Sequence, residues 1–250
     1  MSVEIPSEAV ELLRGAAHVV ALTGAGVSAE SGVPTYRDTL EGMWAKYDPM
    51  QLATPEAFES DPTLVTEWNA WRRRLMREVE PNAAHTALAE LGERMRESGR
   101  EFTLITQNID RLHHRAGSTD AIEIHGNLME WRCSATGAIV EPTDAQLEDP
   151  PVETEAGGHL RPNVVWFGEA LPEEAVSRAM SALESCELFM SIGTSAQVYP
   201  AAGFIEIAKS AGARTMEINR DATPITGAVD VALRGSAAEI LPELVGLAHR

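Results

Sequence analysis

The chain has 250 residues and a formal net charge of −18 at pH 7, enough length for one large α/β domain or a domain with an insertion. This acidity argues against direct binding of DNA or RNA, which needs clustered cations; the one dense cationic run, Arg72 to Arg74, is interpreted as a solvated helix face. No apolar run approaches the roughly 18 residues of a membrane span, so we expect a cytoplasmic protein without membrane contact. The oligomeric state is not predicted.

Six apolar runs along the chain end in glycine or polar residues, and each is typical of a strand buried on both faces. They are HVVALTGAG (18–26), FTLITQN (102–108), AIEIHG (121–126), NVVWFGE (163–169), LFMSIGTS (188–195) and RTMEIN (214–219). Amphipathic segments lie between them at Ala83–Arg96, Pro172–Glu184 and Pro200–Ala211. The alternation predicts an α/β fold, a doubly wound parallel sheet with helices on both faces.

Two segments interrupt this alternation. Residues 39–80 have helical patterning without a strand run, and residues 128–161 are rich in Glu, Pro, Thr and Gly and have a loop-like composition. We expect these two segments to form a small inserted module, and residues 1–38, 81–127 and 162–250 to form the main domain. The two cysteines, Cys133 and Cys186, cannot make a disulfide framework.

The glycine run directly behind the first apolar run marks a turn from a strand into a helix. Gly24 and Gly26 allow a sharp turn and a close approach to a pyrophosphate. Ser28, Glu30 and Ser31 are expected to open a helix whose N–H groups favour an anion. No third glycine completes the common dinucleotide-binding fingerprint, so this motif alone is only partial evidence.

Further polar motifs follow the later apolar runs. TQNID (106–110) brings Asn108 and Asp110 to a strand end, where they could hold a ribose, a carboxamide or a water, or simply cap the next helix. HGN places His125 at another strand end, where an imidazole suits proton abstraction from a hydroxyl, although a lone histidine is more often structural. GTS (193–195) and EIN (217–219) supply further hydrogen-bonding groups.

Taken together, GAGVSAESGVPTYR, TQNID, HGN, VVWFGE, IGTS and EIN occur in the order and at the intervals found in the sirtuins, the NAD-consuming protein-lysine deacylases. The chain resembles this family over residues 24–219. The strings GMWAKYDPMQLATPEAF, PNAAH and VYPAAGF make it most similar to the bacterial and mitochondrial class that includes desuccinylases.

The resemblance implies a Rossmann-like NAD-binding domain, NAD as a consumed co-substrate, and acylated-lysine proteins as partners. The residues that it implies for NAD binding are Gly24, Ala25, Gly26, Ser28, Glu30, Tyr36, Arg37, Gln107, Asn108, Asp110, Gly193, Thr194, Ser195, Asn219 and Ala237. Tyr36 stands where phenylalanine is more usual. The residues that it implies for adding the substrate peptide as a strand are Val164, Phe167, Gly168 and Glu169.

The resemblance also implies a mechanism in which His125 and Asn108 are the catalytic residues. The acyl-lysine carbonyl oxygen attacks the ribose C1′ as nicotinamide leaves, and His125 deprotonates a ribose hydroxyl. Water then completes release of the lysine and of O-acyl-ADP-ribose.

Two departures from the family pattern lead to separate predictions. Two C-x-x-C pairs commonly hold a zinc ion, but here only Cys133 remains, with Thr136, Glu153 and Ala156 at the other positions, so we predict no zinc. In the segment where desuccinylating relatives have a Y-x-x-R pair, Trp68 and Trp71 stand at the simplest alignment. Deacetylation is therefore favoured, although Arg72 or Arg73 could still reach the pocket, and both tryptophans could simply pack the insertion.

The sequence leaves other functions open. The same NAD site would serve mono-ADP-ribosyl transfer or NAD hydrolysis, and a catalytically idle NAD-sensing module would keep the glycine loop. The presence of His125 and Asn108 favours an active enzyme, and the VVWFGE run favours deacylation. The motif set as a whole disfavours a hydride-transferring dehydrogenase.

Overall fold

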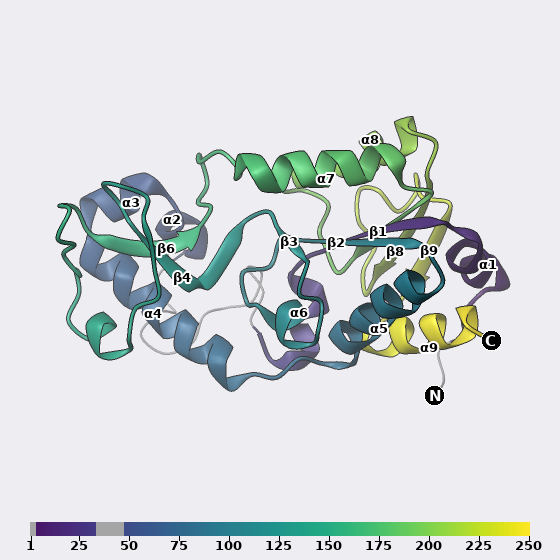
Figure 1. The fold of residues 1–250 in the computed structure, drawn as a ribbon, viewed down its shortest axis with the longest axis horizontal. Helices are drawn as coiled ribbons and strands as arrows, with labels where there is room; N and C mark the ends of the chain where they lie inside the picture. The colour runs from purple at the N-terminus through teal and green to yellow at the C-terminus, as the bar shows by residue number, and fades with distance from the viewer. Residues whose placement is uncertain (1–3, 34–47) are drawn as a thin grey trace.

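The computed structural model describes residues 4–33 and 48–250, and its largest element is a six-stranded parallel sheet (Figure 1). The strands are β1 (His18–Thr23), β2 (Glu101–Thr106), β3 (Ile122–Glu123), β7 (Leu188–Ile192), β8 (Arg214–Asn219) and β9 (Val231–Arg234). Their spatial order is β3-β2-β1-β7-β8-β9. The strand order reverses beside β1, and ligands of such sheets bind at that point, outside the carboxyl ends of the strands. The predicted doubly wound α/β fold is confirmed.

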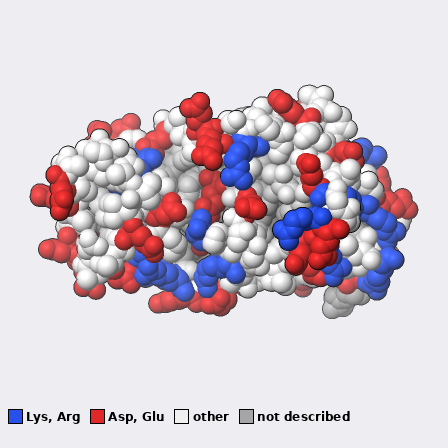
Figure 2. Space-filling view, viewed as in Figure 1, with Lys and Arg blue, Asp and Glu red and all other residues white. Residues whose placement is uncertain are grey.

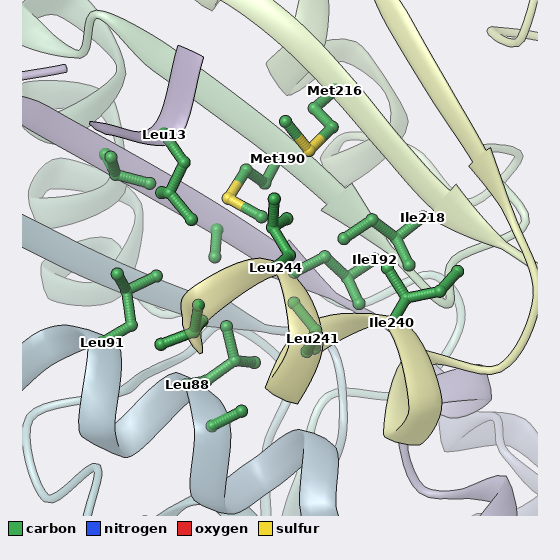
Figure 3. Packing of buried hydrophobic residues seen from close by; sticks show 14 of the residues in the cluster. Leu13, Leu88, Leu91, Met190, Ile192, Met216, Ile218, Ile240, Leu241 and Leu244 are labelled. Atoms are coloured by element: carbon green, nitrogen blue, oxygen red, sulfur yellow. The ribbon is translucent and has the colours of Figure 1, made fainter. Parts of the chain in front are cut away.

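Helices cover both faces of this sheet (Figure 1). One face carries α1 (Ser7–Gly15), α5 (Ala83–Glu97) and α9 (Ala237–Ala248), whose leucines and isoleucines pack on β1, β7 and β8 (Figure 3). The other face carries α7 (Glu173–Ser185) and α8 (Phe204–Ser210), which follows the 3₁₀ turn Ala201–Gly203. Alternate residues of β1 point into the two cores, which explains why this strand is apolar throughout.

A smaller unit lies at the opposite end of the molecule from α1 and α9 (Figure 1). It contains α2 (Pro49–Leu52), α3 (Pro55–Ser60), α4 (Pro62–Glu78) and the antiparallel strands β4 (Gly126–Cys133), β5 (Ile139–Val140) and β6 (Leu160–Val164), with a 3₁₀ turn at Ala145–Leu147. The strands have the order β5-β4-β6. Thr54 and Asp61 start α3 and α4, because their side chains accept hydrogen bonds from Ala57 N–H and Leu64 N–H.

The structure corrects two strand predictions. The run NVVWFGE does not enter the parallel sheet; its first residues belong to β6, an edge strand of the small sheet, and the sixth parallel strand is β9, which the sequence reading missed. Pro162 lies within β6 and has no N–H to donate, which suits an edge. Both runs are short and apolar, and hydrophobicity alone does not tell in which sheet a strand lies.

The loop-like reading of residues 128–161 is also wrong, because the segment supplies strands to the small sheet. Its core is formed by single residues from separate elements, Trp131, Leu147 and Leu160, packed on Ala70 of α4. Such a core leaves no apolar run in the sequence. The expected domain boundaries stay a prediction. Across residues 4–33 and 48–250, no helix has both the length and the apolar character needed to cross a membrane.

Candidate active site

The glycine run lies directly behind β1 and packs against the loop that follows β7. Gly24 N–H donates to the carbonyl of Ile192 at 3.0 Å, and Gly26 N–H donates to that of Gly193 at 2.8 Å. A Cβ on Gly26 would lie 2.7 Å from the Gly193 oxygen, and one on Gly24 would lie 2.9 Å from the Cα of Thr194. Both glycines are therefore required for the close packing of two strand-end loops, independently of any ligand.

The segment after these glycines does not form the expected helix. It forms two 3₁₀ turns, Ala25–Val27 and Ala29–Ser31, and Gly32 ends the second turn with a φ of 84°. Ser28, between the turns, directs its hydroxyl into the protein interior instead of capping a helix. The start of α5 lies against the first turn, because its N-cap Asn82 donates to the Val27 carbonyl at 2.9 Å, and α9, which begins at Ala237, also contacts this turn.

Ser28 is the centre of a buried polar cluster at the ends of β1 and β2. Its hydroxyl donates to Asp110 Oδ2 at 2.7 Å and accepts from Asn108 Nδ2 at 3.1 Å. His85 Nδ1 accepts from the backbone N–H of Asn82, so its Nε2 carries the proton and faces the Ser28 oxygen at 3.3 Å. Asp110 also accepts from Leu112 N–H. These bonds fix the orientation of the Asn108 amide and of the Asp110 carboxylate.

A second buried histidine lies against the first. The rings of His113 and His85 are 4.7 Å apart, and His113 Nε2 lies 2.9 Å from the hydroxyl of Thr23, which donates to Thr106. Burial lowers the pKa of His85 to about 4 and that of His113 to about 3. Both rings are therefore neutral at pH 7, and they serve as fixed hydrogen-bonding groups beneath the site.

His125 lies just after β3 and differs from His85 and His113 in that its Nε2 is available to a substrate. Its Nδ1 donates to the backbone carbonyl of Gln107 at 3.0 Å, so Nε2 carries a free lone pair. Burial lowers its pKa below the usual value, against a smaller opposing effect of the bond to Gln107. A neutral imidazole with one oriented basic nitrogen is the form that a general base requires.

The loop after β7 joins several of the predicted nucleotide contacts. Gln107 Nε2 donates to the hydroxyl of Thr194 at 3.0 Å, and Asn219 Nδ2 donates to the Thr194 carbonyl at 2.8 Å. Ser195 follows Thr194 and is half-buried, and Gly193 has a φ of 60°. The sheet thus brings together residues more than a hundred positions apart in the sequence.

Glu30 and Ala237 lie on the same side of the sheet, where side chains connect three loops. The Glu30 carboxylate accepts from Arg220 Nη2 at 2.6 Å and from the hydroxyl of Ser236. Ser236 also caps α9, since its oxygen accepts from Ala238 N–H. Burial raises the pKa of Glu30, but the bonds from Ser236 and Arg220 outweigh it and hold that pKa below its usual value. The carboxylate is thus engaged within the fold.

Asp110 also lines a cavity of about 240 Å³ between the two units. The other residues around it are Met76, Arg77, Arg111, Arg115 and Met129. Burial raises the pKa of Asp110, against the bonds from Leu112 N–H and Ser28. Tyr36 and Arg37, the remaining predicted contacts, lie outside the described residues.

In the small unit, the two predicted acyl-pocket residues have different surroundings. Trp68 is 1% exposed and belongs to the core between α4, β4 and β6, whereas Trp71 is partly buried against that core. The Arg72 guanidinium lies 4.6 Å from the centre of the Trp68 ring. Arg73 turns away, because it donates to Asp144 and to the carbonyl of Pro142.

The predicted peptide-binding segment leaves β6 and turns sharply. Val164 is buried in β6, and Phe167 is 39% exposed with its N–H bonded to the carbonyl of Ala53 at 2.9 Å. Gly168 has a φ of 90°, which permits the turn. The Glu169 carboxylate is held by Arg161 and by Trp166 N–H, so it does not face a peptide as a free group.

The residues at the positions of the usual zinc ligands do not fit a zinc ion. Cys133 Sγ lies 3.1 Å from the Thr154 hydroxyl and 3.4 Å from the Gly157 carbonyl, and Thr154 itself donates to Gly157 at 2.6 Å. In the described ranges no group of three or more His, Cys, Asp or Glu side chains is placed to hold a metal. One thiol, one hydroxyl and one carboxylate, with Ala156 at the fourth position, lack the closed four-ligand shell of structural zinc.

The sequence reading missed several residues of this site. One of them is His85, whose ring accepts from the backbone N–H of Asn82 three residues earlier in a capping box. Arg220 and Ser236 act through Glu30, which is about two hundred positions away, so no local pattern marks them. Arg161 pairs with Glu169 only eight residues later, but across a turn that the expected strand did not include. On the face drawn in Figure 2, acidic side chains are spread over both units and basic ones lie among them.

Comparison with known proteins gives consistent matches. The Sir2 family model matches residues 24–200. NAD-dependent protein deacylase 1 of Pseudomonas aeruginosa is 46% identical over 244 residues, which cover 94% of this chain and 96% of that protein. The NAD-dependent protein deacylase of Thermus thermophilus is 46% identical over 232 residues, which cover 93% and 91%.

Solved structures agree with these matches. A Sir2 homologue in complex with NAD superimposes with a TM-score of 0.90 at 42% identity, covering 99% of this chain and 95% of that one. A Sir2 variant in complex with a deacetylated p53 peptide and 3′-O-acetyl ADP-ribose superimposes with a TM-score of 0.85 at 32% identity, covering 96% and 97%.

Proposed function

The chain belongs to the Sir2 family, and on this premise we infer that it is an NAD-dependent protein deacylase. Its substrates are proteins that carry acylated lysine. NAD, once bound, supplies the ribose carbon to which the acyl oxygen is transferred, and nicotinamide is released. The remaining assignments concern the roles of this chain's own residues.

His125 is the general base, and its state is the single observation that carries the mechanism. The hydrogen bond from Nδ1 to the Gln107 carbonyl selects the tautomer whose Nε2 accepts a proton. The lowered pKa keeps that nitrogen unprotonated at neutral pH. Nε2 accordingly takes the proton from a ribose hydroxyl, a step typically worth 10²–10⁴ in rate.

Asn108 and Asp110 orient the nicotinamide end of the co-substrate. The Asn108 amide nitrogen is committed to Ser28, which leaves its oxygen to accept from a water or a ribose hydroxyl. The Asp110 carboxylate, held by Ser28 and by Leu112 N–H two residues beyond it, is an acceptor that suits the amide group of nicotinamide. The glycine loop, the loop 193–195, Asn219 and the start of α9 hold the rest of the nucleotide.

We assign the acyl preference to acetyl or apolar groups. Binding of a succinyl carboxylate needs a cation directed into the pocket, and indole cannot supply one. Arg73 is committed to Asp144 and Pro142, and Arg72 lies over Trp68 with a bond to Asn69. These contacts favour a deacetylase over a desuccinylase within the desuccinylase-like class. We further propose that the enzyme is cytoplasmic and works without zinc.

The test is to incubate the purified protein with NAD and matched acetyl-lysine and succinyl-lysine peptides, following peptide mass and nicotinamide together. We expect NAD-dependent loss of acetyl, faster than loss of succinyl, and its disappearance in His125→Ala. Faster loss of succinyl would reverse the acyl assignment. Nicotinamide release from an unchanged peptide would instead support NAD hydrolysis or ADP-ribosyl transfer.

A further inference from the structure

We propose that Arg161 and Glu169 are positioning residues, which form a clamp that holds the Val164–Gly168 backbone in the shape that binds the acyl-lysine peptide. The inference rests on the proposed function and reassigns Glu169, which the family resemblance places among the peptide contacts. It predicts that the clamp sets the affinity for the peptide and leaves NAD binding unchanged.

The clamp is a bidentate ion pair closed over one turn. Arg161 Nη1 and Nη2 donate to the two oxygens of Glu169 at 2.7 and 2.9 Å, and Nη2 also donates to the Val164 carbonyl at 3.2 Å. Glu169 in turn accepts from Trp166 N–H at 2.9 Å. Arg161 is 7% exposed. One guanidinium thereby ties the beginning of the turn to its end, with the geometry that arginine offers and lysine does not.

Stacking adds a second constraint on the same residues. The Arg161 guanidinium carbon lies 3.4 Å from the centre of the Trp166 ring. Glu169 N–H donates back to the Trp166 carbonyl at 3.0 Å, and Arg132 Nη2 lies 3.4 Å from the Glu169 carboxylate. Burial raises the pKa of Glu169, but the bonds from Arg161 and Trp166 outweigh it, so the carboxylate stays charged.

The turn that is held in this way presents backbone groups for an added strand. Phe167 N–H donates to the carbonyl of Ala53. Within the described residues, the Phe167 carbonyl and the N–H and carbonyl of Gly168 make no hydrogen bond. An extended peptide binds through such unpaired groups. If the turn relaxed, these groups would lose their alignment, and the peptide would bind more weakly.

The same backbone is connected to the catalytic base. Val165 N–H donates to the carbonyl of His125 at 2.9 Å, and Gly126 pairs with Val164 in the small sheet. A peptide laid along this segment is therefore registered against His125 itself. These backbone contacts, in which the side chains of Arg161 and Glu169 take no part, keep the register to His125, so the clamp acts on the affinity for the peptide and has no contact of its own to the reacting atoms.

The experiment compares Arg161→Lys and Glu169→Gln with wild type in NAD-dependent deacetylation. Arg161→Lys keeps the charge and Glu169→Gln keeps the shape, so both are expected to fold. We expect the KM for the acetyl-lysine peptide to rise about tenfold, the effect of losing a buried charge-assisted bond. The KM for NAD and the kcat at saturating peptide should stay within about twofold of wild type.

The matched control is Arg73→Lys, another buried arginine paired with a carboxylate in the same unit but bonded to Asp144 and Pro142. It should lower the melting temperature as the clamp variants do and leave the peptide KM unchanged. If Arg73→Lys raises the peptide KM equally, or if neither clamp variant raises it, the positioning role is wrong.

A fluorescent acetyl-lysine peptide, titrated by anisotropy, separates the two levels of inference. Weaker binding by the clamp variants supports the proposal without reference to turnover. If wild type deacetylates the peptide but the clamp variants bind it with unchanged affinity, the clamp is overturned and the deacylase function stands. If wild type neither binds nor deacetylates it, the proposed function fails, and the clamp with it.

Discussion

The two units of the molecule differ in the contacts that connect the elements within each of them. At the carboxyl ends of the parallel strands the closest packing is backbone against backbone, where Gly24 and Gly26 touch the Gly193 loop, although side chains such as Arg220 and Glu30 also join these loops. The apolar cores of the main sheet lie directly behind. In the small unit the corresponding connections are arginine side chains that cross between elements, among them Arg73 to Asp144 and Arg161 to Glu169.

This difference indicates how each unit tolerates change. A backbone contact has no adjustable atoms, so a single added methyl group must move the chain. A long side chain with two partners can lose one of them and still fill its space. We therefore expect changes on the nucleotide side to be nearly all-or-none, and changes on the peptide side to be graded.

The largest effect is expected for Gly26→Ala. The new Cβ would lie 2.7 Å from the Gly193 oxygen and 2.8 Å from its Cα, both backbone atoms, so the two loops must separate. We expect a loss of about 3 kcal/mol in the free energy of unfolding, measured by urea denaturation. We also expect the loss of measurable NAD binding, tested by titration calorimetry. Gly246→Ala is the control, because its Cβ meets nothing within 4 Å in α9. Normal NAD affinity in Gly26→Ala would break the comparison.

The second prediction is that mild acid lowers the free energy of unfolding, because the main unit contains two buried neutral histidines. Unfolded imidazoles bind a proton near pH 6.5, but His85 and His113 do so in the folded protein only near pH 4 and pH 3. Below pH 6.5 the unfolded state thus binds more protons, and stability falls as pH falls. Each histidine costs up to about 1.4 kcal/mol per pH unit, or about 2 kcal/mol by pH 5.

Denaturation curves between pH 7.5 and pH 5 measure this slope. The His113→Gln variant should show a shallower slope, because one of the two groups is gone while carboxyl titrations are shared with wild type and cancel. Equal slopes in the two proteins would show that His113 is not buried in the neutral state.

Arg73→Met should give a smaller and local effect. The methionine keeps part of the apolar stem but leaves the Pro142 carbonyl without its donor, while Asp144 retains Arg77. We expect a loss of about 2 kcal/mol in the free energy of unfolding, with NAD affinity within about twofold of wild type. A loss of NAD binding comparable to that of Gly26→Ala would mean that the two units do not respond separately.

The smallest effect is expected for the turns around Cys133 and Thr154 in the small unit. Thr154→Val removes the hydroxyl that bonds Gly157 and lies beside Cys133, and we expect a loss of about 1 kcal/mol. Excess chelator should leave the melting temperature of wild type unchanged, because hydrogen bonds and not a metal connect these turns. A fall in melting temperature on chelation would show that a metal does contribute.

The main sheet and its helices could be predicted from the sequence better than the small unit. Five of the six apolar runs proved to be strands of the main sheet, and α5 and α7 fell where the amphipathic patterns placed them, because local periodicity encodes such elements. The family membership, read from motifs at strand ends, is shown by the comparisons. The roles of individual site residues remain predictions.

What sequence reasoning missed depends on contacts between distant segments. The 3₁₀ turns at Ala25–Ser31 arise because Ser28 faces Asp110 and Glu30 faces Ser236, partners 82 and 206 residues away. Likewise, the small sheet shares its core among elements that each contribute one large residue, such as Trp131 and Leu147. Propensities describe neighbours along the chain and carry no information about such pairs.

The pairing of α1 with α9 has a practical consequence for handling this enzyme. Arg14 donates to the carbonyls of Leu247 and Ala248, so the two helices lie together, and in Figure 1 they are at the end of the molecule away from the small sheet. A purification tag, a fluorophore or a sensor-chip linkage attached after α9 is therefore held away from the Val164–Gly168 turn, the peptide site that we propose. The immobilised protein should present its catalytic end to solution, which suits surface-based measurement of peptide affinity.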